Sequence, residues 1–313
     1  MPAVRPLARL LIALALAAPF AAQAQEKIRV GLLPFSESLG AVLADKQGFF
    51  KAEGLEMEVT KINSGAVGVP VLQAGKLDII FSNTVSTLQA IEQGLDAVIL
   101  APGAAVRASG ADTTIGLMVR KGSIKSVKEL EGKRVAVNVI NSTAWLHAVA
   151  HLDAKGVDRS KVRFLEVPFP QMNDPLLNSQ VDAIYQVEPF RSVLMATGKA
   201  EVLGYPYVET LPNSDITQYI ALTPWVEKNR ATAVKFARAI IKGAQFANAN
   251  EAATRDANLQ FTGLNPALKD TVMLPRFGTA VSAAEIARTQ DMMIKYGMMK
   301  TKVDLSKRVL ALP

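Results

Sequence analysis

Small polar residues recur in this chain where a short apolar run ends and a helical pattern begins. Four such helix starts occur, at Ser38, Ser64-Gly65, Ser82-Asn83-Thr84 and Ser142-Thr143. The first turn of a helix has free backbone N–H groups and a partial positive charge, so each start could help to bind an anion. These residue types also cap helices, which contributes about 1 kcal/mol without any ligand. Capping suffices to explain any single start, whereas four starts in one cleft favour ligand contact for at least two.

Aromatic residues near these starts could form apolar walls of a site. Packing is the preferred interpretation for Trp145 and Phe190, because each lies within a predicted helix. Phe35 and Phe169 follow strands in proline-flanked loops, where binding residues are frequent, so packing and binding both stay open. The predicted ligand-contacting set is Phe35, Ser36, Ser38, Ser64, Gly65, Ser82, Asn83, Thr84, Asn138, Asn141, Ser142, Thr143, Phe169 and Glu188.

Two arginines and two histidines are further candidates. Arg107 and Arg191 could each pair with a carboxylate or sulfonate through two hydrogen bonds, but most arginines are solvated, and their roles stay open. His147 and His151 stand four residues apart on one predicted helix. No glutamate follows the first histidine, as a zinc protease motif requires. We therefore predict a solvated polar face continued by Lys155, and no metal site.

These candidates lie on strands that alternate with helices along most of the chain, which predicts an α/β fold with mainly parallel sheets covered on both faces. The predicted strands are 28–33, 56–61, 77–81, 97–101, 114–119, 134–138, 162–167, 181–185 and 216–222. The predicted helices are 39–50, 65–74, 84–93, 126–131, 143–155, 171–179, 189–197, 231–248 and 283–296.

The alternation breaks near residues 102–112, and a second alternating unit then runs to a proline-rich bend at 205–212. This pattern predicts two doubly wound lobes joined by a two-strand hinge, with a cleft between them. Lobe 1 would comprise residues 25–106 and 217–313, and lobe 2 residues 107–216. The C-terminal helices would pack on lobe 1.

The first 24 residues have the features of a secretory signal peptide. Arg5 and Arg9 precede the apolar run LLIALALAA, and Ala22-Gln23-Ala24 is a small-residue cleavage site. The apolar run is shorter than the roughly 20 residues that a membrane-spanning helix needs. We expect cleavage after Ala24, which would leave a soluble protein of 289 of the 313 residues.

Composition excludes several kinds of function. The chain has no cysteine, which excludes disulfides, thiolate metal sites, cysteine nucleophiles and a lipid-modified N-terminal cysteine. The formal net charge is +7, of which the signal peptide contributes +2. The excess is spread over the chain and not gathered into a basic run with interleaved aromatics, which argues against a nucleic-acid partner.

Short motifs in a constant order link the chain to a known family. They are QGFFK at 47–51, EGL at 53–55, NSG at 63–65, QAGKLDI at 73–79, EQG at 92–94, LEGKRVAV at 130–137, VDA at 181–183 and EPF at 188–190. Residues 28–223 resemble the periplasmic substrate-binding proteins of ABC importers, in the family of nitrate, taurine, alkanesulfonate and thiamin-pyrimidine binding proteins. The chain departs from its relatives at Asn141-Ser142-Thr143, where many have Gly-Ser, and at Val187-Glu188-Pro189, where sulfonate binders often have Trp-x-Pro.

The resemblance implies a type II periplasmic-binding-protein fold that closes on one small molecule. We expect capture of an organic carboxylate or sulfonate with an apolar or aromatic body, and delivery to an ABC permease in the inner membrane. The protein would be periplasmic and monomeric, with no cofactor. Glu37 and Glu188 could each hold a ligand amine, or could be solvated or capping carboxylates, which is the preferred interpretation of Glu37.

Two other functions are compatible with the same fold. One is a biosynthetic enzyme of the thiamin-pyrimidine or menaquinone pathway. The signal peptide disfavours such a cytoplasmic role. The sequence also lacks the cysteine-rich motif that the pyrimidine synthase of thiamin biosynthesis has, and it shows no nucleophile–base pair. The other function is a sensory protein that presents its ligand to a membrane receptor, which the sequence does not separate from transport.

Overall fold

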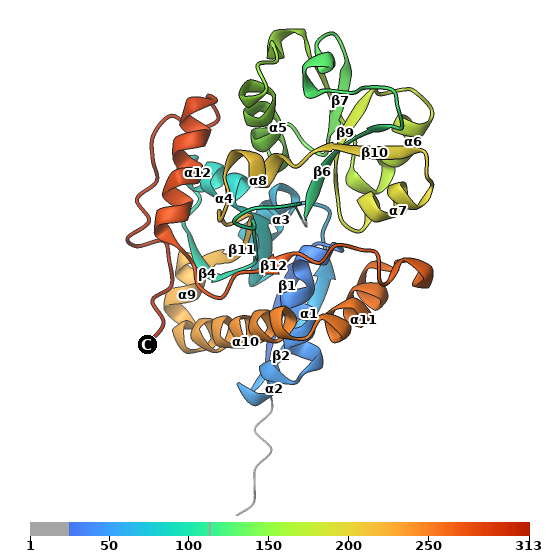
Figure 1. Ribbon diagram of the computed structural model, residues 1–313. Helices are drawn as coiled ribbons and strands as arrows, with labels where there is room; N and C mark the ends of the chain where they lie inside the picture. Colours follow the sequence, from blue (N-terminus) through green and yellow to red (C-terminus); the bar gives the residue numbers. More distant parts are fainter. Residues whose placement is uncertain (1–24, 113) are drawn as a thin grey trace, which may run out of the picture.

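The computed structural model describes residues 25–112 and 114–313. The predicted signal peptide lies outside these residues. Two five-stranded sheets, each with its own helices, form two lobes (Figure 1). The strand order is β2-β1-β3-β11-β4 in the first sheet and β10-β6-β9-β7-β8 in the second. The predicted α/β fold of two lobes is confirmed.

The first sheet contains a strand that enters it from the second lobe. Its members are β1 (Glu26–Leu32), β2 (Leu55–Lys61), β3 (Ile79–Asn83), β4 (Ala97–Pro102) and β11 (Thr217–Leu222). β1 is parallel to both β2 and β3, but β11 is antiparallel to β3 and β4. The second sheet contains β6 (Ile115–Arg120), β7 (Arg134–Val137), β8 (Arg163–Glu166), β9 (Ala183–Val187) and β10 (Ala200–Gly204). There β7 is parallel to β8 and β9, and β6 is antiparallel to β9 and β10.

The expectation of mainly parallel sheets is confirmed, because four of the five strands in each sheet run in the same direction and one, β11 or β6, runs in the opposite direction. Both sheets are mixed because the chain crosses between the lobes. β6 begins where the chain arrives from the first lobe, and β11 where it returns, so each enters its sheet in the opposite sense to the strands beside it.

Most of the helices begin and end where the sequence predicts. The α-helices are α1 (Leu39–Lys46), α2 (Phe49–Ala52), α3 (Gly65–Gln73), α4 (Thr84–Glu92), α5 (Thr143–Ala154), α6 (Asn173–Leu177), α7 (Phe190–Ala196), α8 (Pro206–Thr210), α9 (Thr223–Lys228), α10 (Arg230–Ala249), α11 (Glu251–Thr262) and α12 (Ala283–Lys295). Short 3₁₀ turns occur at η1 (Ser36–Ser38), η2 (Val127–Leu130), η3 (Arg159–Lys161), η4 (Phe169–Gln171) and η5 (Pro266–Leu268). The helix predicted over 39–50 is interrupted at Gly48, whose φ of 72° lies in the left-handed region. No helix in the described part of the chain is both long and apolar enough to cross a membrane.

The C-terminal helices pack on the first lobe, as predicted. Phe236 of α10 lies 5.5 Å from Phe50 of α2 and 5.5 Å from Tyr219 of β11, measured between ring centroids. Gly243 of α10 allows a close approach to α1, since a Cβ there would lie 2.2 Å from the Gly40 carbonyl oxygen. In Figure 1, α10 and α11 run beneath the sheet that contains β1, and α12 lies beside α4. These helices tie the return strand β11 to the first lobe.

The two crossings between the lobes are hydrogen-bonded to one another. The Gly103 N–H donates to Thr217 O at 2.8 Å, the Ile216 N–H to Ala104 O at 2.9 Å, and the Val106 N–H to Ser214 O at 2.9 Å. β5 (Ala104–Ala105) also pairs with β12 (Arg276–Phe277) of the C-terminal segment. These contacts form the two-strand connection that the sequence predicts.

Candidate ligand-binding site

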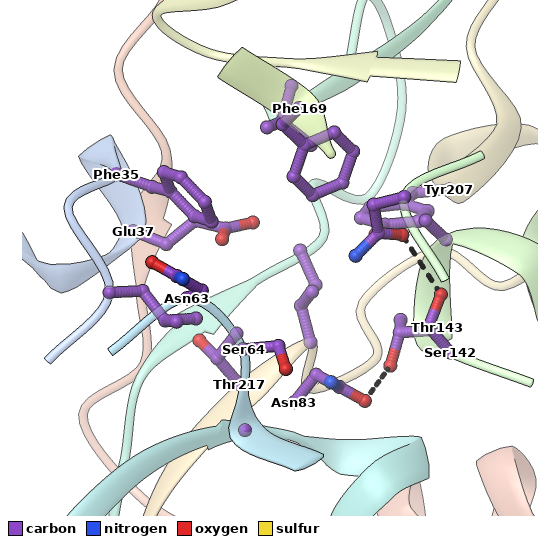
Figure 2. A pocket seen from close by; sticks show the side chains of 16 residues that line it. Phe35, Glu37, Asn63, Ser64, Asn83, Ser142, Thr143, Phe169, Tyr207 and Thr217 are labelled. Carbon is purple, nitrogen blue, oxygen red and sulfur yellow. Dashed lines mark hydrogen bonds between the residues drawn. The ribbon is translucent and has the colours of Figure 1, made fainter. Parts of the chain in front are cut away.

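A cavity lies between the lobes, beside this connection (Figure 2). Its inner part has a volume of about 40 Å³, and an outer part of about 330 Å³ shares several of its residues. The inner part has room for roughly three waters, whereas the outer part falls in the range of small-molecule sites. The polar and aromatic residues around the inner part are Phe35, Glu37, Asn63, Ser64, Asn83, Asn138, Ser142, Thr143, Phe169, Tyr207 and Thr217.

Three helices begin at this cavity. The Val67 N–H of α3 donates to Ser64 Oγ at 3.2 Å, and the Trp145 N–H of α5 donates to Ser142 Oγ at 3.3 Å. The Ser86 N–H of α4 donates to Asn83 Oδ1 at 2.8 Å. All three capping residues therefore serve their helices and also line the cavity. Helix capping and a position at the interlobe cavity therefore occur together in these three residues.

The start of α3 lies unusually close to the end of β3. A Cβ at Gly65 would lie 2.2 Å from Ser82 Oγ and 3.0 Å from Ser82 Cα. Glycine removes this overlap, so the first turn of α3 reaches the cavity between the carboxyl ends of β3 and β1.

Contacts across the cavity hold the two lobes together. Phe35, in the loop after β1, makes edge-to-face contacts with Phe169 and Phe190 of the second lobe, at centroid distances of 5.7 and 5.9 Å. The Thr143 hydroxyl of α5 donates to Asn83 Oδ1 at 3.0 Å and accepts from the Val85 N–H at 3.3 Å. Figure 2 shows Phe35 and Phe169 on one side of the cavity and Asn83 with Thr143 on the other.

Glu37 is the charged residue that lines the inner cavity. Its preferred interpretation as a solvated or capping carboxylate is wrong, because the residue is only 8% exposed and caps no helix through its side chain. Burial, helped by the nearby Asp112 carboxylate, raises the pKa of Glu37 to about 7. Tyr207 lies on the other side of the same space, and burial raises the pKa of its hydroxyl well above the usual value.

Six of the fourteen predicted contact residues lie outside the inner cavity, and most of them have structural partners. Ser36 Oγ donates to Asn258 Oδ1 at 2.9 Å, and Thr84 Oγ1 donates to Asp215 O at 2.9 Å. Ser38 is fully buried, and its hydroxyl makes no capping bond, because η1 extends the helical conformation before α1. Ser82 is buried beneath Gly65, and Asn141 is exposed.

Glu188, the sixth, is held by neighbouring residues of its own lobe. The Arg191 Nε donates to Glu188 Oε1 at 2.9 Å, and Ser192 donates to the same carboxylate through its hydroxyl and its backbone N–H. Arg191 also donates to the carbonyls of Asp112 and Ile115, at 2.8 and 3.0 Å. The pair is therefore a buried structural link, while Arg107 is exposed on the surface.

The predicted solvated face of α5 is also wrong. His147 is 1% exposed and His151 is fully buried, because the short helix α8 covers this side of α5. His147 Nδ1 lies 2.5 Å from Thr210 Oγ1 of α8, and burial lowers the pKa of His147 to about 3. The sequence analysis interpreted residues 205–212 as a proline-rich bend and did not predict α8 within it. Its Pro206 stands at the first helical position, where a missing N–H costs nothing.

Four polar cavity residues were absent from the predicted contact set: Glu37, Asn63, Tyr207 and Thr217. Two of them adjoin predicted residues, since Glu37 lies between Ser36 and Ser38, and Asn63 precedes Ser64. Tyr207 lies in α8 and Thr217 is the first residue of β11, and no local pattern marks either of them. In the described residues, no group of three or more His, Cys, Asp or Glu side chains is arranged to hold a metal ion.

Two α/β lobes with a cavity beside a two-strand connection are the architecture of the periplasmic-binding-protein fold. A family model described as NMT1/THI5 like matches residues 36–253, and the chain belongs to this family. The resemblance predicted from the sequence is thereby confirmed at the level of the family. No curated protein sequence matches the chain significantly.

Solved structures share the fold at low sequence identity. The periplasmic aliphatic sulphonate binding protein SsuA from Escherichia coli is 19% identical with a TM-score of 0.75, over 91% of this chain and 97% of its own. The alkanesulfonate-binding protein SsuA from Xanthomonas axonopodis pv. citri, bound to MOPS, is 17% identical with a TM-score of 0.75, over 90% and 97%. The periplasmic nitrate-binding protein NrtA from Synechocystis PCC 6803 is 13% identical with a TM-score of 0.72, over 91% and 86%.

Proposed function

We propose that this protein is a periplasmic solute-binding protein that captures a small organic carboxylate or sulfonate between its lobes and delivers it to an ABC permease. The main observation behind this proposal is that three capped helices begin at one interlobe cavity, at Ser64, Asn83 and Ser142. Free N–H groups of these first turns suit an anionic group. Phe35 and Phe169 supply apolar surface for the rest of the ligand.

The mechanism that this proposal implies is closure about the two crossings. Lobe 1 would comprise residues 25–106 and 217–313, and lobe 2 residues 107–216. A ligand that touches both lobes favours the closed arrangement, because it binds that arrangement more tightly than the open one. The outer cavity would be the entrance, and contacts such as Thr143 with Asn83 would form on closure.

The solved relatives support this role over an enzymatic one. The three solved relatives described above are named as binding proteins of sulfonates or nitrate. A signal peptide cleaved after Ala24 and a monomeric state belong to the same proposal. A sensory role uses the same ligand capture, and co-purification with a permease or with a receptor would distinguish the two.

A binding screen on residues 25–313 tests the proposal. The panel contains aliphatic and aromatic carboxylates, sulfonates and nitrate. A ligand at 100 times its dissociation constant should add about 2.7 kcal/mol to the free energy of unfolding, which raises the melting temperature by several degrees. Ser142→Ala and Ser64→Ala should weaken binding, whereas Ser306→Ala, near the C-terminus, should not. The absence of any shift across the panel would refute capture of a small anion.

A further inference from the structure

Buried acidic groups of this protein differ in how their charge is compensated. The Glu188 carboxylate receives hydrogen bonds from Arg191 and Ser192. The Asp112 carboxylate accepts from the backbone N–H groups of Thr114, Ile115 and Val208, at 2.8, 3.3 and 3.3 Å. Glu37 has no such compensation, since no donor within residues 25–112 and 114–313 makes a hydrogen bond or ion pair with its carboxylate.

The Glu37 side chain faces the cavity. Figure 2 shows its carboxylate between Phe35 and Phe169, above Asn63. Burying a carboxylate without a donor is costly, so such a group either takes up a proton or meets a partner from outside the protein. No lysine or arginine lines the inner or the outer cavity in the described residues.

We propose that Glu37 is a recognition site for a protonated nitrogen of the ligand. This inference rests on the proposed function: the ligand would hold its anionic group at the helix starts of Ser64 and Ser142 and its ammonium group at Glu37. The Tyr207 hydroxyl, which also lines the inner cavity, offers the same nitrogen a second acceptor.

The charged and titratable groups around Glu37 favour a cation. Asp112 and Tyr207 are the groups that act on it electrostatically, and neither carries positive charge. The His147 ring contacts the Tyr207 ring at a tilt of 55°, with centroids 4.5 Å apart, but burial lowers the pKa of His147 to about 3, so it is neutral. Arg191 donates to the backbone carbonyl of Asp112 and is already paired with the Glu188 carboxylate.

This arrangement predicts that the affinity for a ligand with an ammonium group increases as the pH rises. The pKa of Glu37 is about 7 in the free protein, so the residue is mostly protonated at pH 6 and mostly ionised at pH 8. A ligand ammonium group binds the ionised form, so binding below pH 7 releases a proton. We therefore expect about tenfold tighter binding at pH 8 than at pH 6. A ligand that placed an anionic group at Glu37 would show the opposite sign.

Three small probes separate the two halves of the site: 3-aminopropanesulfonate, propanesulfonate and propylammonium. Calorimetry at pH 6 and pH 8, in buffers of different ionisation enthalpy, measures the affinity and the number of protons released. We expect 3-aminopropanesulfonate to bind at least tenfold more tightly than either other probe, with proton release at pH 6. Glu37→Gln should abolish this preference and the pH dependence. Glu58→Gln, which removes an exposed carboxylate of β2 paired with Lys27, should change neither.

The outcomes test the two proposals separately. Equal binding of propanesulfonate and 3-aminopropanesulfonate, unaffected by Glu37→Gln, would overturn the role of Glu37 and leave anion capture standing. Proton uptake at pH 6 in place of release would also overturn it. Binding of propylammonium that Glu37→Gln abolishes, without binding of propanesulfonate, would support the role of Glu37 and count against capture of an anion. Failure of all three probes to bind would overturn both.

Discussion

Thr143 and Asn83 join the two lobes through a direct hydrogen bond of 3.0 Å between their side chains. Asn83 ends β3 and caps α4 in the first lobe, while Thr143 is the first residue of α5 in the second. Thr143 also accepts a hydrogen bond from the Val85 N–H. A single hydroxyl therefore makes hydrogen bonds from the second lobe to two residues of the first lobe beside the cavity.

Thr143→Val should weaken ligand binding without unfolding the protein. Valine has nearly the same shape but cannot bond to Asn83 or Val85, and a hydrogen bond contributes about 1 kcal/mol net. We expect a fivefold to tenfold loss of affinity by calorimetry and a larger radius of gyration by small-angle scattering. Thr262→Val is the control, since its hydroxyl bonds only within α11, to Asn258 O. An unchanged affinity would show that the contact does not stabilise the closed form.

The ionisation of Glu37 should lower the stability of the free protein as pH rises. Its pKa is about 7 in the folded protein against an ordinary 4.5. The folded state therefore holds this proton more tightly, and the stabilisation is complete below pH 4.5 and lost as pH rises through 7. The difference corresponds to about 3 kcal/mol.

Urea unfolding of the wild-type protein and of Glu37→Gln, between pH 4.5 and pH 8, measures this effect. The wild-type free energy of unfolding should fall by about 3 kcal/mol relative to the variant over this range. Other titrating groups, such as Asp215, are common to both proteins and cancel in the difference. Parallel stability curves would mean that Glu37 is not desolvated in solution.

Breaking the Glu188–Arg191 pair should destabilise the second lobe strongly. Arg191→Met leaves the Glu188 carboxylate without its cation and the carbonyls of Asp112 and Ile115 without a donor. Removal of one partner of a buried ion pair costs about 3–5 kcal/mol. The double variant Glu188→Gln, Arg191→Met should recover part of the loss, because it removes both charges of the pair and leaves neither unpaired. Guanidinium unfolding checks both values, and a double variant as unstable as the single one would assign the cost to packing alone.

Gly65→Ala should displace the start of α3 from the cavity. The added Cβ would lie within 3.0 Å of the Ser82 side chain and backbone, so either strand or helix must move. We expect a destabilisation of about 1–3 kcal/mol together with loss of ligand affinity. Gly40→Ala is the matched control, because its Cβ would meet nothing closer than Phe277 Cδ1 at 3.6 Å. Equal effects of the two substitutions would contradict a special role of Gly65.

Much of the fold could be predicted because its signals are local. Serine or asparagine at a helix start bonds to an N–H three residues on, as Ser64 and Asn83 do. Strand β10 and helix α8 were missed, since neither has a strong local pattern, and both are stabilised by packing on β6 and α5. The burial of His147 was missed for the same reason, because α8 covers it.

The sequence by itself determined the alternation of strands and helices and the capped helix starts, because these depend on residues within a few positions of one another. It did not determine which buried carboxylate would have its negative charge balanced by a cation. Glu37 and Glu188 both lie in loops that follow buried strands, and the sequence does not show whether the nearby Arg191 pairs with Glu188 or is solvated. Only the tertiary structure gives Glu188 an arginine fixed in a buried network and leaves Glu37 facing the cavity. The physical reason is that burial and the orientation of a side chain depend on residues far apart in the chain: the Asp112 and Ile115 carbonyls hold Arg191 beside Glu188, whereas Glu37 faces the cavity.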